Sequence, residues 1–115
     1  MKILLPTGAF SGALTAALML TISVPAQAVD AEAAQTLARQ NKCFKCHAID
    51  KKKEAIPWKE AAAKLKTKPD AQAIVIKHIT SGAKVKLDDG TQEEHPIVKG
   101  KPDEIKNLAD WILSL

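Results

Sequence analysis

The chain has 115 residues, which is enough for one domain, and only 3% of them are aromatic. Its formal net charge is +4, but the lysines are not interleaved with aromatic side chains and Arg39 is the only arginine, so the sequence does not predict nucleic-acid binding. The sequence has two cysteines, Cys43 and Cys46, so any disulfide, thiolate metal site or thioether-linked cofactor must use these two.

Residues 1–28 have the pattern of a cleaved secretory signal. Lys2 gives a short positive start, an apolar run extends from Leu14 to Val24, and Ala26-Gln27-Ala28 places small residues where a signal peptidase cuts. Serines and threonines interrupt the apolar run, which falls short of the roughly 18 residues that favour an uncleaved membrane anchor. We therefore predict export to the periplasm and no membrane insertion after cleavage.

Cleavage would leave residues 29–115, a domain of 87 residues (115 minus 28) with a formal charge of +3, because Lys2 is the only charged residue removed. Domains of this size often need a disulfide, a bound metal or another cross-link to be stable. The first predicted helix covers 31–40, with Asp30 as its N-cap and an apolar stripe of alanines and leucine. This helix leads directly into the two cysteines.

The motif Cys43-Phe44-Lys45-Cys46-His47 is a CxxCH, which is typical of covalent haem attachment. Two thiols at this spacing can add to the two vinyl groups of one porphyrin, and the following imidazole can bind the iron. A disulfide, a redox dithiol and a zinc site are alternatives, but the sequence lacks the strand-turn-helix setting of a redox dithiol. We predict that one covalently attached haem c forms a large part of the hydrophobic core.

Two helices are expected after the motif. Ile56-Pro57 interrupts any preceding helix, and Trp58 begins a helical pattern that continues to Leu65. After a break at Pro69, we expect Asp70 to cap a helix over 71–80, with Val75 and Ile79 on its apolar face.

The segment 82–100 loses helical periodicity, is acidic, and is expected to be a long loop that contains His95-Pro96. Pro102 then opens a last helix, with Asp103 and Glu104 in its first turn and an inward face of apolar residues. The predicted class is therefore all-α, with about four helices.

This order of helices around CFKCH resembles the small bacterial class I cytochromes c. The closing stretch Leu108-Ala109-Asp110-Trp111-Ile112-Leu113 is also similar to the last helix of that family. The resemblance implies that the first and last helices cross, that His47 is the proximal iron ligand, and that the Pro57 carbonyl orients His47. It covers essentially all of residues 29–115.

One position departs from the family pattern. The usual sixth ligand is a methionine followed by proline, but Met1 and Met19 both lie in the predicted signal, and His95-Pro96 occupies the matching position. We predict ligation by His47 and His95, which should lower the redox potential relative to methionine ligation. The alternatives are His78, which the helical pattern directs away from the Val75 and Ile79 face, and a deprotonated lysine such as Lys99.

Trp58 is expected to lie in the core on the haem side, where its indole could also bond a haem propionate. The predicted function is one-electron transfer with redox partner proteins, and no enzymatic turnover is expected. One alternative is reversible binding of NO, CO or oxygen at a displaceable sixth position. The other is an electron-transfer subunit of a redox enzyme.

Overall fold

Four α-helices form most of the computed structural model, which describes Gly8 and residues 28–115. They are α1 (Ala31–Gln40), α2 (Trp58–Leu65), α3 (Ala71–Thr80) and α4 (Pro102–Ser114), with a 3₁₀ helix η1 (Cys43–Lys45) and two strands, β1 (Lys84–Lys86) and β2 (Gln92–Glu94). The predicted signal lies outside the described residues, apart from Gly8 and Ala28. None of the helices in 28–115 is long and apolar enough to cross a membrane.

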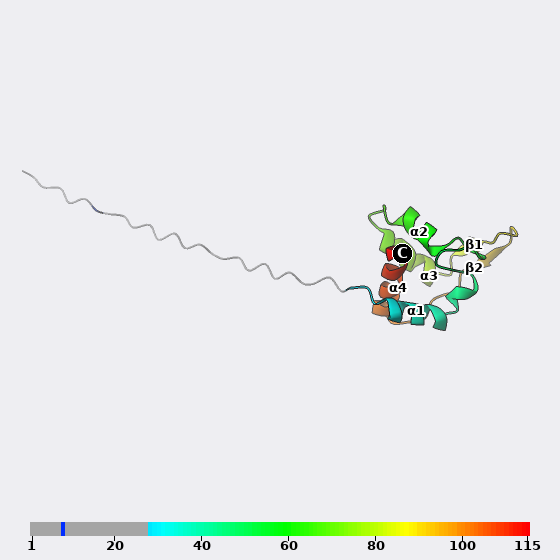
Figure 1. Cartoon of the computed structure of the whole chain (residues 1–115), viewed down its shortest axis with the longest axis horizontal. Helices are drawn as coiled ribbons and strands as arrows, with labels where there is room; N and C mark the ends of the chain where they lie inside the picture. Colours follow the sequence, from blue (N-terminus) through cyan, green and yellow to red (C-terminus); the bar gives the residue numbers. More distant parts are fainter. Residues whose placement is uncertain (1–7, 9–27) are drawn as a thin grey trace, which may run out of the picture.

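Helix α4 is central, because α1, α2 and α3 all pack against it (Figure 1). The α1 and α4 backbones approach closely because Ala34, Ala38 and Ala109 are fully buried small residues in the shared core. At one end of this pair, the Asp30 N–H donates to Asn107 Oδ1 (2.9 Å) and Asn107 Nδ2 donates to the Asp30 carbonyl (2.8 Å). The start of α1 is thereby joined to α4.

The helix starts agree with the sequence patterns at α1 and α4 but not at α3. Asp30 Oδ1 accepts the Ala33 N–H at 2.9 Å, and the Glu104 carboxylate accepts the Lys101 N–H at 2.8 Å. Asp70 precedes α3, but its side chain makes no capping hydrogen bond. Its backbone (φ −106°, ψ 21°) is not in the extended conformation that directs an N-cap side chain toward the helix.

The expected loop over 82–100 contains a β-hairpin, which the sequence reading missed. Strands β1 and β2 are antiparallel, with Lys84 opposite Glu94. Asp89 accepts the N–H and hydroxyl of Thr91 (2.9 and 2.6 Å), and Gly90 takes a positive φ of 85°. The Asp89-Gly90 pair is a common hairpin turn signal, so the information was present in the sequence.

The core extends from the α1–α4 contact to the two tryptophans. Trp58 and Trp111 are buried and meet edge to face, with ring centroids 5.6 Å apart. The other buried members are Ala34, Leu37, Ala38, Val75, Ile79, Val98, Leu108, Ala109 and Ile112. Because Trp58 also contacts the CxxCH motif, this core directly supports the candidate site.

Candidate haem site

The CxxCH motif folds as a single tight turn after α1. Lys42 has a left-handed φ of 58°, which redirects the chain into η1. The Cys46 and His47 N–H groups then both donate to the Cys43 carbonyl, at 3.2 and 3.0 Å. Side chains at positions i, i+3 and i+4 of a helical turn share one side. This spacing therefore gathers the side chains of Cys43, Cys46 and His47.

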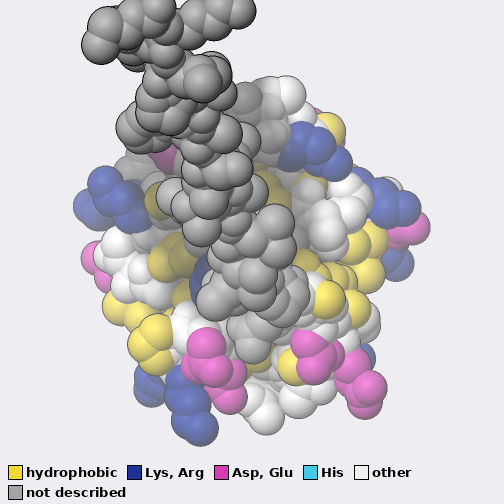
Figure 2. All heavy atoms as spheres, turned by 90° about the vertical axis from the view of Figure 1, so that its left-hand side faces the viewer, with side chains coloured by type: hydrophobic (Ala, Val, Ile, Leu, Met, Phe, Trp, Pro, Cys, Tyr) yellow, Lys and Arg dark blue, Asp and Glu magenta, His cyan; other side chains and the backbone are white. Residues whose placement is uncertain are grey.

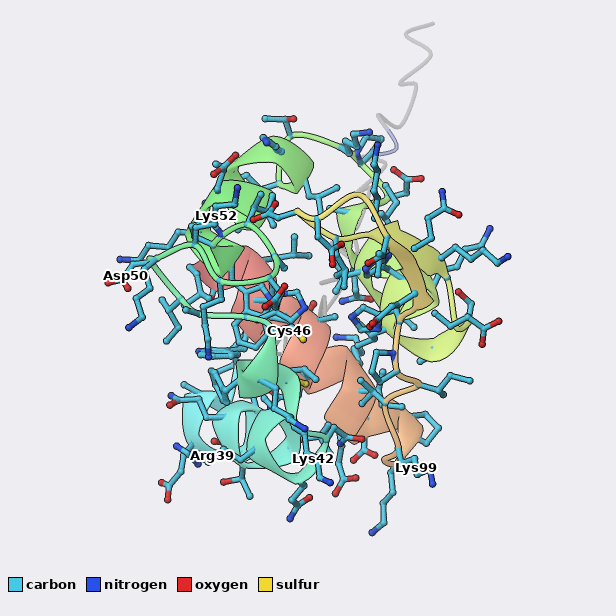
Figure 3. The ribbon with its side chains drawn as sticks, turned by 90° about the vertical axis from the view of Figure 1, so that its right-hand side faces the viewer. Arg39, Lys42, Cys46, Asp50, Lys52 and Lys99 are labelled. Carbon is cyan, nitrogen blue, oxygen red and sulfur yellow. The ribbon has the colours of Figure 1, made fainter. Side chains whose placement is uncertain are left out.

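Both cysteines are free thiols, so the disulfide alternative is not observed. Cys43 is half-buried and its burial raises the pKa of its thiol, whereas Cys46 is exposed. Figure 3 shows Cys46 near the middle of one face, with Lys52 on one side and Lys42 and Lys99 on the other. The opposite face in Figure 2 carries basic and acidic side chains interspersed with apolar ones.

His47 is held against the tryptophan core. Its ring stacks on Trp58 with centroids 5.1 Å apart and an interplanar angle of 22°, while Phe44 packs on Trp58 from the motif at 5.3 Å. Burial lowers the pKa of His47 to about 4, and the nearby His95 and His78 add to this effect. The imidazole is therefore neutral at neutral pH, which is the form that binds iron.

The hydrogen bond expected between His47 and Pro57 is absent. The Pro57 carbonyl instead accepts the N–H groups of Glu60 and Ala61, both at 3.0 Å, because Pro57 is the N-cap of α2. His47 Nδ1 is buried without a hydrogen-bond partner among the described residues. A buried polar atom in this state costs free energy: this nitrogen lacks an acceptor if it is protonated, and a donor or a metal if it is not.

The His95 ring lies near that of His47, with ring centroids 6.0 Å apart and an interplanar angle of 49°. Imidazole–metal bonds are about 2 Å long and a ring nitrogen lies roughly 1 Å from the ring centre, so two imidazoles on opposite sides of one metal ion have centres about 6 Å apart. The observed separation is close to that distance.

His95 is fixed at two atoms. Its backbone N–H donates to the Ala83 carbonyl at 2.7 Å, and its Nδ1 lies 2.8 Å from the Pro96 carbonyl. A carbonyl can only accept, so Nδ1 carries a proton in this contact, and in a neutral imidazole Nε2 then has the lone pair. The nitrogen left free is thus the one able to bind a metal.

His78 is exposed and lies outside the core, as its place on the helix predicts. Its ring centroid is nevertheless only 4.7 Å from that of His95, a neighbour that the sequence did not indicate. Helical periodicity describes the faces of α3 and carries no information about a loop returning beside it. That return is fixed by the Val98 N–H, which donates to the Ile79 carbonyl at 2.8 Å.

Asn41 is a further site residue that sequence reasoning missed. Its amide donates to the carbonyls of Leu37 (3.0 Å) and Lys99 (3.1 Å), and its Oδ1 accepts the Lys99 N–H (2.8 Å). It therefore ties the end of α1, just before the CxxCH motif, to the chain just after His95. An asparagine beyond a helix end signals a local cap, but a partner 58 residues away leaves no local pattern.

The sequence model of the family described as Cytochrome c matches residues 31–115. The chain belongs to the cytochrome c family. This cytochrome c is 53% identical to the class 1 cytochrome MtoD of Sideroxydans lithotrophicus ES-1, whose crystal structure has a TM-score of 0.74 and covers 76% of this chain and 97% of its own. It is 31% identical over 99 residues to cytochrome c-551 of Pseudomonas aeruginosa, covering 84% of this chain and 90% of that protein.

A second structural relative is cytochrome c552 of Nitrosomonas europaea, at 31% identity and a TM-score of 0.57, covering 70% of this chain and 96% of that one. The predicted family and its all-α fold are thus confirmed. Cytochromes c bind haem c covalently, and this chain has two cysteines for the attachment. The thiols of Cys43 and Cys46 beside His47 on one turn, the unpartnered His47 nitrogen and the nearby His95 ring fit that cofactor.

Proposed function

We propose that this cytochrome c is a periplasmic one-electron carrier with haem attached at Cys43 and Cys46 and ligated by His47 and His95. The observation that carries this proposal is the 6.0 Å separation of the two facing imidazoles. When bound, haem c supplies one-electron chemistry at its iron. The periplasmic assignment rests on the signal pattern of residues 1–28.

The protein's part in this function is to hold both ligands in place. Trp58 stacks on His47, and the Ala83 carbonyl anchors the backbone of His95. Fixed ligands change little between the ferric and ferrous states, which reduces the reorganisation that accompanies electron transfer. Two imidazoles also lack the thioether that raises the potential of methionine-ligated haem, so a lowered potential is expected.

The attachment of His95 at two atoms favours electron transfer over the binding of a gas molecule. A ligand that diatomic gases displace would need freedom to leave the site, but both the backbone and Nδ1 of His95 are engaged. If His47 and His95 both held the iron, they would leave no coordination position open for substrate chemistry. The lysines around Cys46 in Figure 3 would face a redox partner, and they favour one with an acidic surface.

Absorption and EPR spectra of the holoprotein test this function. We expect low-spin haem in both redox states, EPR signals typical of two imidazole ligands, and a ferrous spectrum that CO does not change. Rapid formation of a CO complex would instead support the ligand-binding alternative. Mass spectrometry of the exported protein should show one added haem on a chain that begins at Val29.

A further inference from the structure

A second imidazole lies on the same side of the site as His95. His78 is in the last turn of α3, and its ring is tilted 55° to that of His95 with centroids 4.7 Å apart. The imidazoles of His78 and His95 therefore lie side by side at this site, and the His95 ring is the one measured against His47.

The His78 and His95 backbones are anchored separately. Val75 and Ile79 are buried and hold α3 in the core, while the Ala83 carbonyl holds the backbone of His95. The Val98–Ile79 hydrogen bond keeps the two segments side by side. The position of His78 therefore does not depend on the side chain of His95.

The imidazole of His78 has no other role in the structure. Within residues 28–115 it makes no side-chain hydrogen bond or ion pair with another residue. It is exposed, so its side-chain torsions can change without disturbing the core. A lysine ammonium must lose a proton before it can bind a metal, whereas a neutral imidazole can coordinate directly.

We propose that His78 is a reserve distal ligand, which binds the haem iron when His95 is removed or displaced. This inference rests on the proposed ligation by His47 and His95. The site then contains one proximal imidazole and two distal imidazoles, of which one is bound at a time. Loss of His95 alone should leave six-coordinate, low-spin iron.

Four holoproteins test the proposal by EPR and absorption spectroscopy at pH 7.5: His95→Ala, His78→Ala, the double variant, and His95→Ala combined with Lys77→Ala. The Lys77 change is the matched control, because Lys77 is exposed on the same turn of α3. We expect low-spin spectra for both single variants and for the control. The double variant should become high-spin and bind CO, and added imidazole should restore its low-spin spectrum.

The outcomes separate this inference from the proposed function. A high-spin His95→Ala protein overturns the reserve role of His78 but leaves His95 as the native ligand. A double variant that stays low-spin also overturns the reserve role, because another group then binds the iron. If His78→Ala alone is high-spin, His78 is the native ligand and both proposals fail. Should His95→Ala not incorporate haem, His95→Gln gives the same comparison with a side chain closer in size.

Discussion

At the residue scale, the candidate site depends on a series of packed aromatic rings that connects the core to His47, the proposed proximal ligand. Trp111 meets Trp58 edge to face, and Trp58 stacks on His47. Aromatic pairs in such geometries stabilise each other by about 0.5–1.5 kcal/mol beyond the burial of area. The orientation of His47 is therefore set by packing, in the absence of the expected Pro57 hydrogen bond.

Trp58→Ala should destabilise the holoprotein by about 3–5 kcal/mol, because it removes a large buried side chain. Guanidinium chloride unfolding, followed by circular dichroism, measures this loss. Trp58→Phe is the control, since it keeps an aromatic ring against His47 and should cost clearly less. If Trp58→Phe lost as much stability as Trp58→Ala, an aromatic ring packed against His47 would contribute nothing to stability.

His95→Met should raise the redox potential, because a thioether replaces an imidazole that stabilises ferric iron. Axial ligands help set haem potentials over a range of about 0.8 V, so the change should be readily resolved by voltammetry. Lys99→Met, on the exposed chain nearby, is the matched control and should leave the potential nearly unchanged. An unchanged potential in the His95 variant, with no methionine bound, would contradict the ligand assignment.

At the element scale, the site is assembled by contacts between segments distant in sequence. Asn41 connects the end of α1 to Lys99, and Asn107 connects the start of α1 to α4. The hairpin extends from this frame, and its acidic side chains are exposed, with Asp88 3.2 Å from Lys52 in a solvent-exposed ion pair. Solvent screening weakens such charges, so the axial ligands should influence the potential more than the hairpin does.

Asn41→Ala should cost about 1–3 kcal/mol, because it leaves backbone groups of the site loop without partners. It should also accelerate hydrogen exchange at the amide of Lys99, which donates to Asn41. Asn107→Ala is the matched control, since Asn107 likewise joins two distant segments through its amide, but at Asp30. Asn107→Ala should lose comparable stability without faster hydrogen exchange at the Lys99 amide. If the Lys99 amide exchanged equally fast in both variants, Asn41 would have no specific role in holding the chain at Lys99.

At the scale of the whole molecule, haem adds to a core made from few large side chains. Leu108 is the largest side chain that is fully buried in the described part of the chain, and the remaining core is rich in alanine. A bulky cofactor fixed by two covalent bonds adds apolar surface that this domain cannot supply itself. Haem attachment should therefore contribute to folding as well as to function.

The double variant Cys43→Ser and Cys46→Ser tests the covalent attachment. Wild-type protein should retain haem in denaturant, whereas the variant should release it and unfold at a lower temperature. Haem retention after denaturation is measured by mass spectrometry, and the melting temperature by calorimetry. Denaturation-resistant haem in the double variant would show that attachment does not use these cysteines.

The sequence by itself determined the family, the four helices and the cofactor, because these depend on short-range chemistry. CFKCH is a local motif, and the caps of α1 and α4 involve partners three residues apart. The hairpin was also encoded locally, in Asp89-Gly90, but the acidic and aperiodic surroundings favoured a loop. At Asp70 the sequence instead predicted too much: aspartate is a suitable N-cap residue, but its backbone conformation before α3 does not let the side chain cap the helix.

Only the tertiary structure decided how the site is assembled. The approach of His95 to His47, the position of His78 beside His95, and the Asn41–Lys99 connection all join segments separated by 17–58 residues. Side-chain periodicity assigns a residue to a face of its own helix, but it does not say which distant segment packs there. The packing of α1 and α3 on α4 fixes those neighbours, and so it decides which imidazoles meet.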